Sequence, residues 1–126
     1  MPSLSEALQS FSAVVVTGGS SGIGKSFIEL MGKLKTDLSF CNLSRQPPAK
    51  NSFGKRLNHV PCDLSRAAAI EQAAGQVEDW LAREAPRGRL LLINNSGIGA
   101  YGRFPEPNLA RQLEMIDVNV GAVVHL

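Results

Sequence analysis

Short apolar runs alternate along the chain with longer stretches in which apolar residues recur every three or four positions. The short runs predict strands at residues 13–16, 38–43 and 90–93, and a weaker strand is expected near residues 58–60. The longer stretches predict helices over residues 23–34, after residue 63, and from about residue 108. This alternation is typical of βαβ units, in which helices cover both faces of a parallel sheet. We therefore expect a single α/β domain.

The predicted helices carry more detailed expectations. The first should have one apolar stripe, made of Ile23, Phe27, Leu30, Met31 and Leu34. The second should be capped by Asp63 or Ser65. Its apolar face should contain Ile70, Val77, Trp80 and Leu81. The third is still apolar where the sequence stops at Leu126, without a polar tail or a glycine stop. That ending predicts a truncated copy of a longer protein, with an exposed sheet edge and an exposed helix face that favour association.

A glycine-rich segment, residues 17–24, lies between the first strand and the first helix. Glycines there permit a tight turn, a close approach of backbone to phosphate oxygens, and close packing of helix on strand. The helix that follows directs its free N–H groups and positive dipole end at a bound anion. We predict a phosphate-binding turn for a dinucleotide, with these cofactor-binding residues: Gly18, Ser20, Ser21, Gly22, Ile23 and Gly24.

A second motif overlaps this turn. Residues 19–26 match the P-loop pattern GxxxxGK[ST], in which Lys25 would reach the β- and γ-phosphates and Ser26 would hold Mg²⁺. A P-loop enzyme also needs an acidic residue at the end of a later buried strand. The strongest later strand ends instead in the uncharged pair Asn94-Asn95, and Asp63 follows only a weak strand. A P-loop nucleotidase therefore remains the less favoured alternative.

Four motifs, in order, give the chain its resemblance to the short-chain dehydrogenase/reductase family. Residues 17–24 fit the family's TGxxxGxG turn, and Asp63-Leu64 fit its acidic–apolar pair. Residues 94–97 fit its NNAG motif, with Ser96 in place of the usual alanine. Residues 117–120 fit the segment around its helix asparagine, here Asn119. The resemblance extends from residue 12 to residue 126.

The resemblance implies a Rossmann-type doubly wound parallel sheet with strand order 3-2-1-4. Residues 1–126 would form the NADP(H)-binding N-terminal half, without the catalytic half. Asp63 and Leu64 would touch the adenine ring, and Asn95, Ser96 and Gly97 would also belong to the cofactor site. There the Asn95 side chain would tie neighbouring strands and loops together by hydrogen bonds, and Gly97 would keep the path of the cofactor ribose clear. Asn119 would act in catalysis by positioning a water at a helix kink. The implied activity is hydride transfer between a nicotinamide and a small-molecule carbonyl or alcohol substrate, and the full-length form is expected to be a homo-oligomer.

Cofactor choice is expected to depend on the end of the second strand. An acidic residue there would bind the ribose 2′-hydroxyl, whereas an arginine accommodates a 2′-phosphate. The chain has Ser44 and Arg45 at this point and no Asp or Glu beside them. We predict a preference for NADP(H) over NAD(H).

The family's catalytic Tyr-x-x-x-Lys pair does not occur in these 126 residues. The one tyrosine, Tyr101, is followed four residues later by Pro105. The chain by itself is therefore predicted to be inactive, and a non-catalytic dinucleotide-binding module is a further alternative.

Composition narrows the remaining possibilities. The net charge of +2 comes from scattered residues, which argues against nucleic acid as a partner. No apolar run is long enough to span a membrane and no signal peptide is evident, so a cytoplasmic location is expected. Cys41 and Cys62 have no metal-ligand spacing. We expect them to be inert core residues and expect no metal site.

Overall fold

A parallel sheet organises the computed structural model, which describes residues 1–49, 57–104 and 106–126. Residues 50–56 and residue 105 lie outside the described residues. The strands of the described chain are β1 (Phe11–Thr17), β2 (Ser39–Ser44), β3 (Leu57–Pro61) and β4 (Arg89–Ile93). Their spatial order is β3-β2-β1-β4, and all the pairings are parallel. The predicted fold class and strand order are confirmed.

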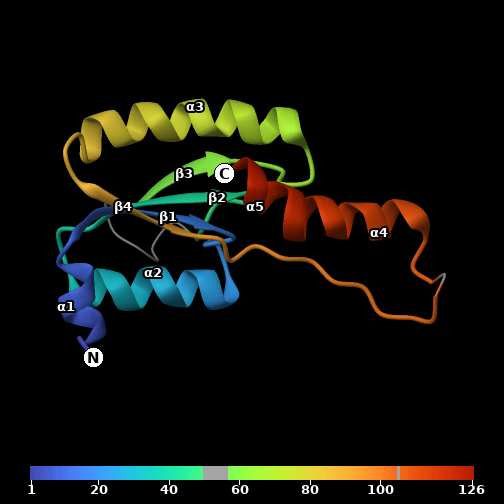
Figure 1. Cartoon of the computed structure of the whole chain (residues 1–126), viewed down its shortest axis with the longest axis horizontal. Coiled ribbons are helices and arrows are strands. Elements are labelled where there is room, and N and C mark those ends of the chain that lie inside the picture. Colours follow the sequence, from blue (N-terminus) through green and yellow to red (C-terminus); the bar gives the residue numbers. More distant parts are fainter. Residues whose placement is uncertain (50–56, 105) are drawn as a thin grey trace.

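Helices cover the two faces of this sheet (Figure 1). Helices α1 (Leu4–Leu8) and α2 (Gly22–Leu34) lie on one face, and α3 (Ala67–Glu84) crosses the other. After β4 a long loop leads out to α4 (Leu109–Ile116), and the chain returns to contact α3 through α5 (Ala122–His125). None of the helices in the described ranges is both long enough and apolar enough to cross a membrane.

Each face of the sheet has its own apolar core, because successive strand residues point to opposite faces. Val14, Val16 and Phe40 pack toward α2. Val15 and Leu43 pack toward α3, together with the other members of that cluster, which include both cysteines. Burial raises the pKa of the Cys41 thiol to about 11 and also raises that of Cys62, so both thiols stay protonated at neutral pH. The prediction of buried, unpaired cysteines is confirmed.

The predicted core stripe of α2 is wrong in part. Met31 is buried as expected, but its buried neighbours on the helix are Gly24 and Ile28. The other predicted stripe residues are exposed: Ile23, Phe27, Leu30 and Leu34. The two stripes are offset by one residue, or about 100° around the helix. Gly24 decides which one faces the sheet, because it lets the helix approach the strand without a side chain between them.

The apolar face of α3 is as predicted, but its start is not. Ile70, Val77 and Trp80 are buried, and Leu81 packs against them. The N-cap position is Arg66, and no side chain caps the helix. The Asp63 carboxylate instead accepts hydrogen bonds from the N–H and hydroxyl of Ser65, so these two residues form a local turn before the helix.

The last helical segment begins as predicted and is then interrupted. The Asn108 side chain caps α4 by accepting a hydrogen bond from the Arg111 N–H. A π-helical turn (Asp117–Gly121) separates α4 from α5. Most apolar residues of this segment are exposed, as predicted, and so are Leu90 and Leu92 of β4.

Candidate functional site

An open cleft of about 600 Å³ lies at the carboxyl ends of the strands, within the usual size of a small-molecule site (about 300–1,000 Å³). Eleven of the predicted cofactor-binding residues line it: Gly18, Ser20, Ser21, Ile23, Ser44, Arg45, Asp63, Leu64, Asn95, Ser96 and Gly97. They come from four loops that are distant in sequence. In parallel α/β sheets this end of the strands is the usual ligand site.

The glycine turn forms one wall of the cleft, and its conformation depends on glycine at three positions. Gly18 and Gly22 have φ of +67° and +55°, in the left-handed region that side chains disfavour. A Cβ on Gly24 would lie 2.4 Å from the carbonyl oxygen of Gly18. Gly22 and Gly24 do not line the cleft themselves. They shape the turn that presents Ser20, Ser21 and Ile23.

The segment after β4 is bonded directly to this turn. The buried Thr17 hydroxyl accepts hydrogen bonds from the N–H groups of Asn95 (3.0 Å) and Ser96 (2.9 Å). The Asn95 side-chain amide donates to the carbonyl oxygens of Thr17 (3.0 Å) and Gly18 (3.3 Å). These four bonds join two motifs that lie 77 to 79 residues apart in the sequence. The predicted role of Asn95 in tying neighbouring loops together is confirmed.

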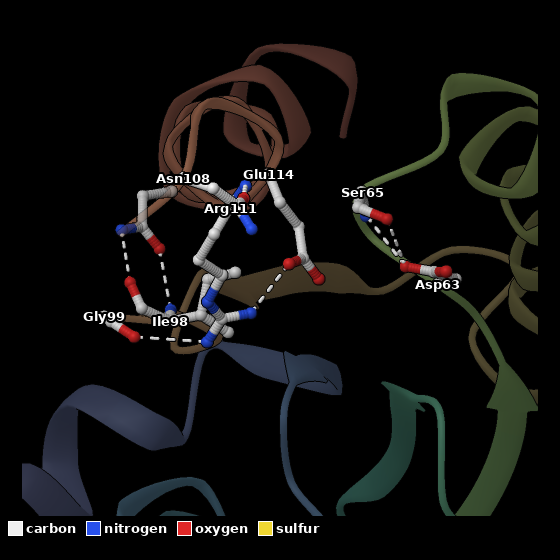
Figure 2. A network of polar contacts seen from close by, with 8 residues as sticks. Asp63, Ser65, Ile98, Gly99, Asn108, Arg111 and Glu114 are labelled. Atoms are coloured by element: carbon white, nitrogen blue, oxygen red, sulfur yellow. Dashed lines mark hydrogen bonds and ion pairs between the residues drawn. The ribbon is translucent and has the colours of Figure 1, made fainter. Parts of the chain in front are cut away.

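The wall formed by the end of β2 and the turn after β3 contains two charged residues of the cleft, Arg45 and Asp63. Ser44 is buried at the end of β2 and donates a hydrogen bond to the Gln46 carbonyl oxygen at 2.7 Å. Arg45 is exposed and lines the cleft. Hydrogen bonds from the Ser65 hydroxyl and N–H lower the pKa of Asp63, with smaller contributions from the positive charges of Arg45 and Arg66. Asp63 is therefore an anion at neutral pH, fixed by Ser65 (Figure 2).

The loop after Gly97 is held by the last helical segment. Asn119, in the π-helical turn, accepts a hydrogen bond from the Ile98 N–H and donates one to the Ile98 carbonyl oxygen, both at 2.9 Å. Arg111 bridges the Glu114 carboxylate (2.7 Å) and the Gly99 carbonyl oxygen (3.1 Å), as Figure 2 shows. Asn119 is thus linked to the cleft through Ile98 and is not among its lining residues.

Sequence reasoning missed six lining residues: Gln46, Pro47, Cys62, Ile98, Glu114 and Val118. Gln46, Cys62 and Ile98 adjoin predicted residues, and Pro47 follows Gln46, so these four could have been included as neighbours. Glu114 and Val118 are four residues apart, so they lie on one face of the helical segment that precedes Asn119. This four-residue spacing is the sequence feature that could have grouped these two residues on one helix face. Tyr101 and Phe104 are highly exposed and do not line this cleft.

Lys25 and Ser26, the two functional residues of the overlapping P-loop motif, are not among the residues that line the cleft. The Lys25 Nζ lies 3.8 Å from the Glu29 Oε1, with which it forms an ion pair on the helix surface. The Ser26 hydroxyl donates to the Gly22 carbonyl oxygen of the same helix. Within the described ranges, no group of three or more His, Cys, Asp or Glu side chains could hold a metal ion. The placement of Lys25 and Ser26 outside the cleft favours a dinucleotide over a magnesium–nucleoside triphosphate.

Comparison with known proteins agrees with this geometry. Residues 12–126 match the family model described as short chain dehydrogenase. The chain belongs to the short-chain dehydrogenase family. It is 27% identical over 115 residues to the NADPH-dependent 3-dehydrocapnine reductase of Ornithobacterium rhinotracheale, a match that covers 89% of this chain and 39% of that protein.

Solved structures show the same fold. The NADPH-bound carbonyl reductase from chicken fatty liver has a TM-score of 0.77 and 27% identity, over 92% of this chain and 48% of that one. A short-chain dehydrogenase from Leptospira borgpetersenii with bound NAD⁺ has a TM-score of 0.77 and 20% identity, over 99% and 46% of the two chains. The chain therefore spans less than half the length of these relatives.

Proposed function

We propose that the cleft binds NADP(H) and that the chain is the cofactor-binding part of an oxidoreductase. The activity of the whole protein would be hydride transfer between the nicotinamide and a small carbonyl or alcohol substrate. Membership of the short-chain dehydrogenase family supports the reaction class. The cleft, lined by the glycine turn and by the segment after β4, supports the binding site.

The residues of the turn fit a dinucleotide diphosphate. A Cβ at Gly22 would meet no atom within 4 Å, so the space in front of the turn is open. The first N–H groups of α2 have no partners within the helix, and they carry its positive dipole end. Ser20, Ser21 and Ile23 would therefore bind the diphosphate, while Asp63 and Leu64 would contact the adenine ring. Asn95, Ser96 and Gly97 would border the nicotinamide side.

The observation that carries the cofactor assignment is the pair Ser44 and Arg45 at the end of β2, where both side chains border the cleft. The Arg45 guanidinium can form two parallel hydrogen bonds to a 2′-phosphate. No carboxylate of β2 is present to bind a 2′-hydroxyl in its place. The NADPH-dependent reductase of Ornithobacterium rhinotracheale and the NADPH-bound chicken enzyme agree with this assignment.

Titration with NADPH and NADH tests this proposal. We expect NADPH to bind at least about tenfold more tightly than NADH, because a charge-assisted contact to the 2′-phosphate is made only by NADPH. Arg45→Asp should abolish that preference. Arg87→Asp makes the same charge change at an exposed turn after α3, outside the cleft, and should leave the preference intact. Equal affinities in the unaltered chain, or an unchanged preference in Arg45→Asp, would contradict the assignment.

Bound NADPH would supply the hydride, and the residues of this chain would bind and orient it. Asn119 would act on the reaction by holding the loop at Ile98, beside the predicted nicotinamide position. A tyrosine–lysine pair for proton transfer is not present in the 126 residues. We therefore expect catalysis from the whole protein and none from residues 1–126 alone.

A non-catalytic dinucleotide-binding module is the second candidate. The observation that favours it is that these 126 residues contain a dinucleotide turn and no tyrosine–lysine pair. The two candidates differ in one measurement on the whole protein, the loss of NADPH absorbance with a panel of aldehydes and ketones. Turnover of any of these substrates supports the oxidoreductase. NADPH binding without turnover supports the module.

We also propose that the whole protein forms homo-oligomers through the α4–α5 stripe. This stripe is a row of exposed apolar residues at spacings of three and four along one helical segment: Leu109, Leu113, Ile116, Val120 and Val124. Such spacing places the residues on one side of the helix, as in helix-to-helix packing. A contiguous apolar stripe of this kind is typical of a protein–protein contact.

A further inference from the structure

Asn42 is a polar residue at a core position of β2. Its register partner in β1 is Val16, and both side chains point to the face of the sheet that α2 covers. Its side chain is completely buried. Its strand neighbour on that face, Phe40, is apolar, as are Val14 and Val16 of β1. An apolar residue would suit this position, because a buried amide lowers stability unless all of its polar atoms find partners.

The Asn42 carboxamide is fully engaged, and one of its partners is the glycine turn. Its Oδ1 accepts a buried hydrogen bond from the Gly19 N–H at 2.7 Å. Its Nδ2 contacts the Ser44 hydroxyl oxygen at 2.9 Å and the His59 Nδ1 at 3.1 Å. Both atoms accept from the amide nitrogen, which fixes the orientation of the carboxamide. Burial lowers the pKa of His59 and so keeps its Nδ1 available as an acceptor.

The base of the turn is thus held from both sides. On the β4 side Asn95 donates to the Gly18 carbonyl oxygen, and on the β2 side Asn42 accepts from the Gly19 N–H. The main chain adds a bond from the Gly18 N–H to the Leu43 carbonyl oxygen at 2.9 Å. With the Gly19 N–H directed at Asn42, the N–H groups from Ser20 onward are the ones presented to the cleft.

We propose that Asn42 is a positioning residue for the dinucleotide turn, one that fixes Gly19 so that the following N–H groups face the cofactor diphosphate. This inference rests on the proposed function. It also links two parts of the cofactor site, because Ser44 at the selectivity position helps to orient the same carboxamide. Asn42 lies outside the four motifs that carry the family resemblance.

The test compares Asn42→Leu with Asn58→Leu in the full chain. Asn58 lies on the neighbouring strand, and its side-chain amide donates to the Cys41 sulfur at 3.6 Å, away from the turn. In Asn42→Leu, an orphaned Gly19 N–H should weaken NADPH binding about tenfold. Adenosine 2′-monophosphate has no diphosphate, so its affinity should change by less than about twofold. Asn58→Leu should leave both affinities unchanged.

One further measurement and one further variant keep the test decisive. Gly19 amide hydrogen exchange, followed by NMR in the ligand-free chain, should be at least about tenfold faster in Asn42→Leu. Should the leucine variant not fold, Asn42→Ser, whose hydroxyl stops short of Gly19, should give the same pattern.

The inference is overturned if NADPH affinity in a folded variant stays at the wild-type value, if both ligands weaken equally, or if Gly19 exchange is unchanged. A wild-type chain that binds neither ligand contradicts the proposed function, and Gly19 exchange then decides the role of Asn42 by itself.

Discussion

Strands β2 and β4 flank β1 on its two sides, and both are rich in apolar residues, yet their surroundings are opposite. Every residue of β2 is buried, and Leu43 is completely inaccessible. No residue of β4 is fully buried, and Leu90 is 42% exposed. β2 has strand neighbours on both sides and helices above and below it. β4 has β1 on one side and an unpaired edge on the other, within the part of the chain that the structure describes.

This difference shows that burial depends on neighbours more than on the apolarity of a strand. The same difference distinguishes two walls of the candidate site. The walls built by β1, β2 and the turn after β3 are packed and hydrogen-bonded, and we assign the diphosphate and adenosine to them. The wall built by β4 and α4 carries exposed apolar residues, and we assign the nicotinamide to this side.

The largest effect should come from filling the space at Gly24, on the packed side. A Cβ there would lie 2.4 Å from the Gly18 carbonyl oxygen and 2.5 Å from the Asn95 amide nitrogen. Gly24→Val should lower the free energy of unfolding by about 4 kcal/mol and abolish NADPH binding.

Gly75→Ala is the control for Gly24→Val, because a Cβ at this exposed position in α3 meets no atom within 4 Å. It should raise stability by about 1 kcal/mol through helix propensity. Urea unfolding and NADPH titration of the two variants measure both effects, and wild-type binding by Gly24→Val would show that the turn is assembled differently.

Matched leucine truncations test the comparison of the two strands directly. Leu43→Ala removes a fully buried side chain of β2 and should cost about 3 kcal/mol. Leu90→Ala, at a partly exposed position of β4, should cost less than about 1 kcal/mol. Urea unfolding of both variants measures the difference. Equal losses would mean that Leu90 is covered in solution, by a second copy or by another part of the protein.

The smallest effect on stability is expected on the exposed α4–α5 stripe. Leu113→Lys places a charge at a half-exposed position and should change the free energy of unfolding by less than about 0.5 kcal/mol. It should nevertheless shift the protein toward monomer in light scattering, because the stripe is the proposed contact. Gln72→Lys, on the exposed side of α3, is the control and should leave association unchanged. An unchanged oligomer in Leu113→Lys would remove the stripe from the interface.

The pattern of the sequence predicted the sheet well because β1, β2 and β4 each coincide with an apolar run bounded by turns. β3, which contains Asn58 and His59, gave the weaker signal. It failed on the α2 stripe, since Ile23 and Phe27 are as apolar as Ile28 and only the close approach at Gly24 decides between them. It also missed α1, although Ser3 and Glu6 form a capping box at its start. That signal is short, and a five-residue helix has no apolar periodicity to support it.

The site was predicted where local motifs carry it and missed where tertiary structure builds it. Gly18, Ser20 and Asn95 belong to continuous motifs and lie in the cleft as expected. Glu114 lines the cleft because α4 lies beside the loop that follows β4, where Arg111 bonds to the Gly99 carbonyl oxygen. Asn42 bonds to Gly19 because its strand lies beside the glycine turn. No local pattern at Asn42 predicts its bond to the turn. The four-residue spacing of Glu114 and Val118 predicts a shared helix face, but it does not predict that this face borders the cleft.

The central claim is that this chain holds a dinucleotide through the glycine turn and the segment after β4. The most direct measurement is the change in backbone amide chemical shifts of the ¹⁵N-labelled chain on titration with NADPH. We predict saturable shifts concentrated at residues 18–23, 44–45 and 95–97, with little change on the exposed face of α4. Shifts that are absent, that centre on the α4 face, or that arise only with ATP and Mg²⁺ would contradict the account.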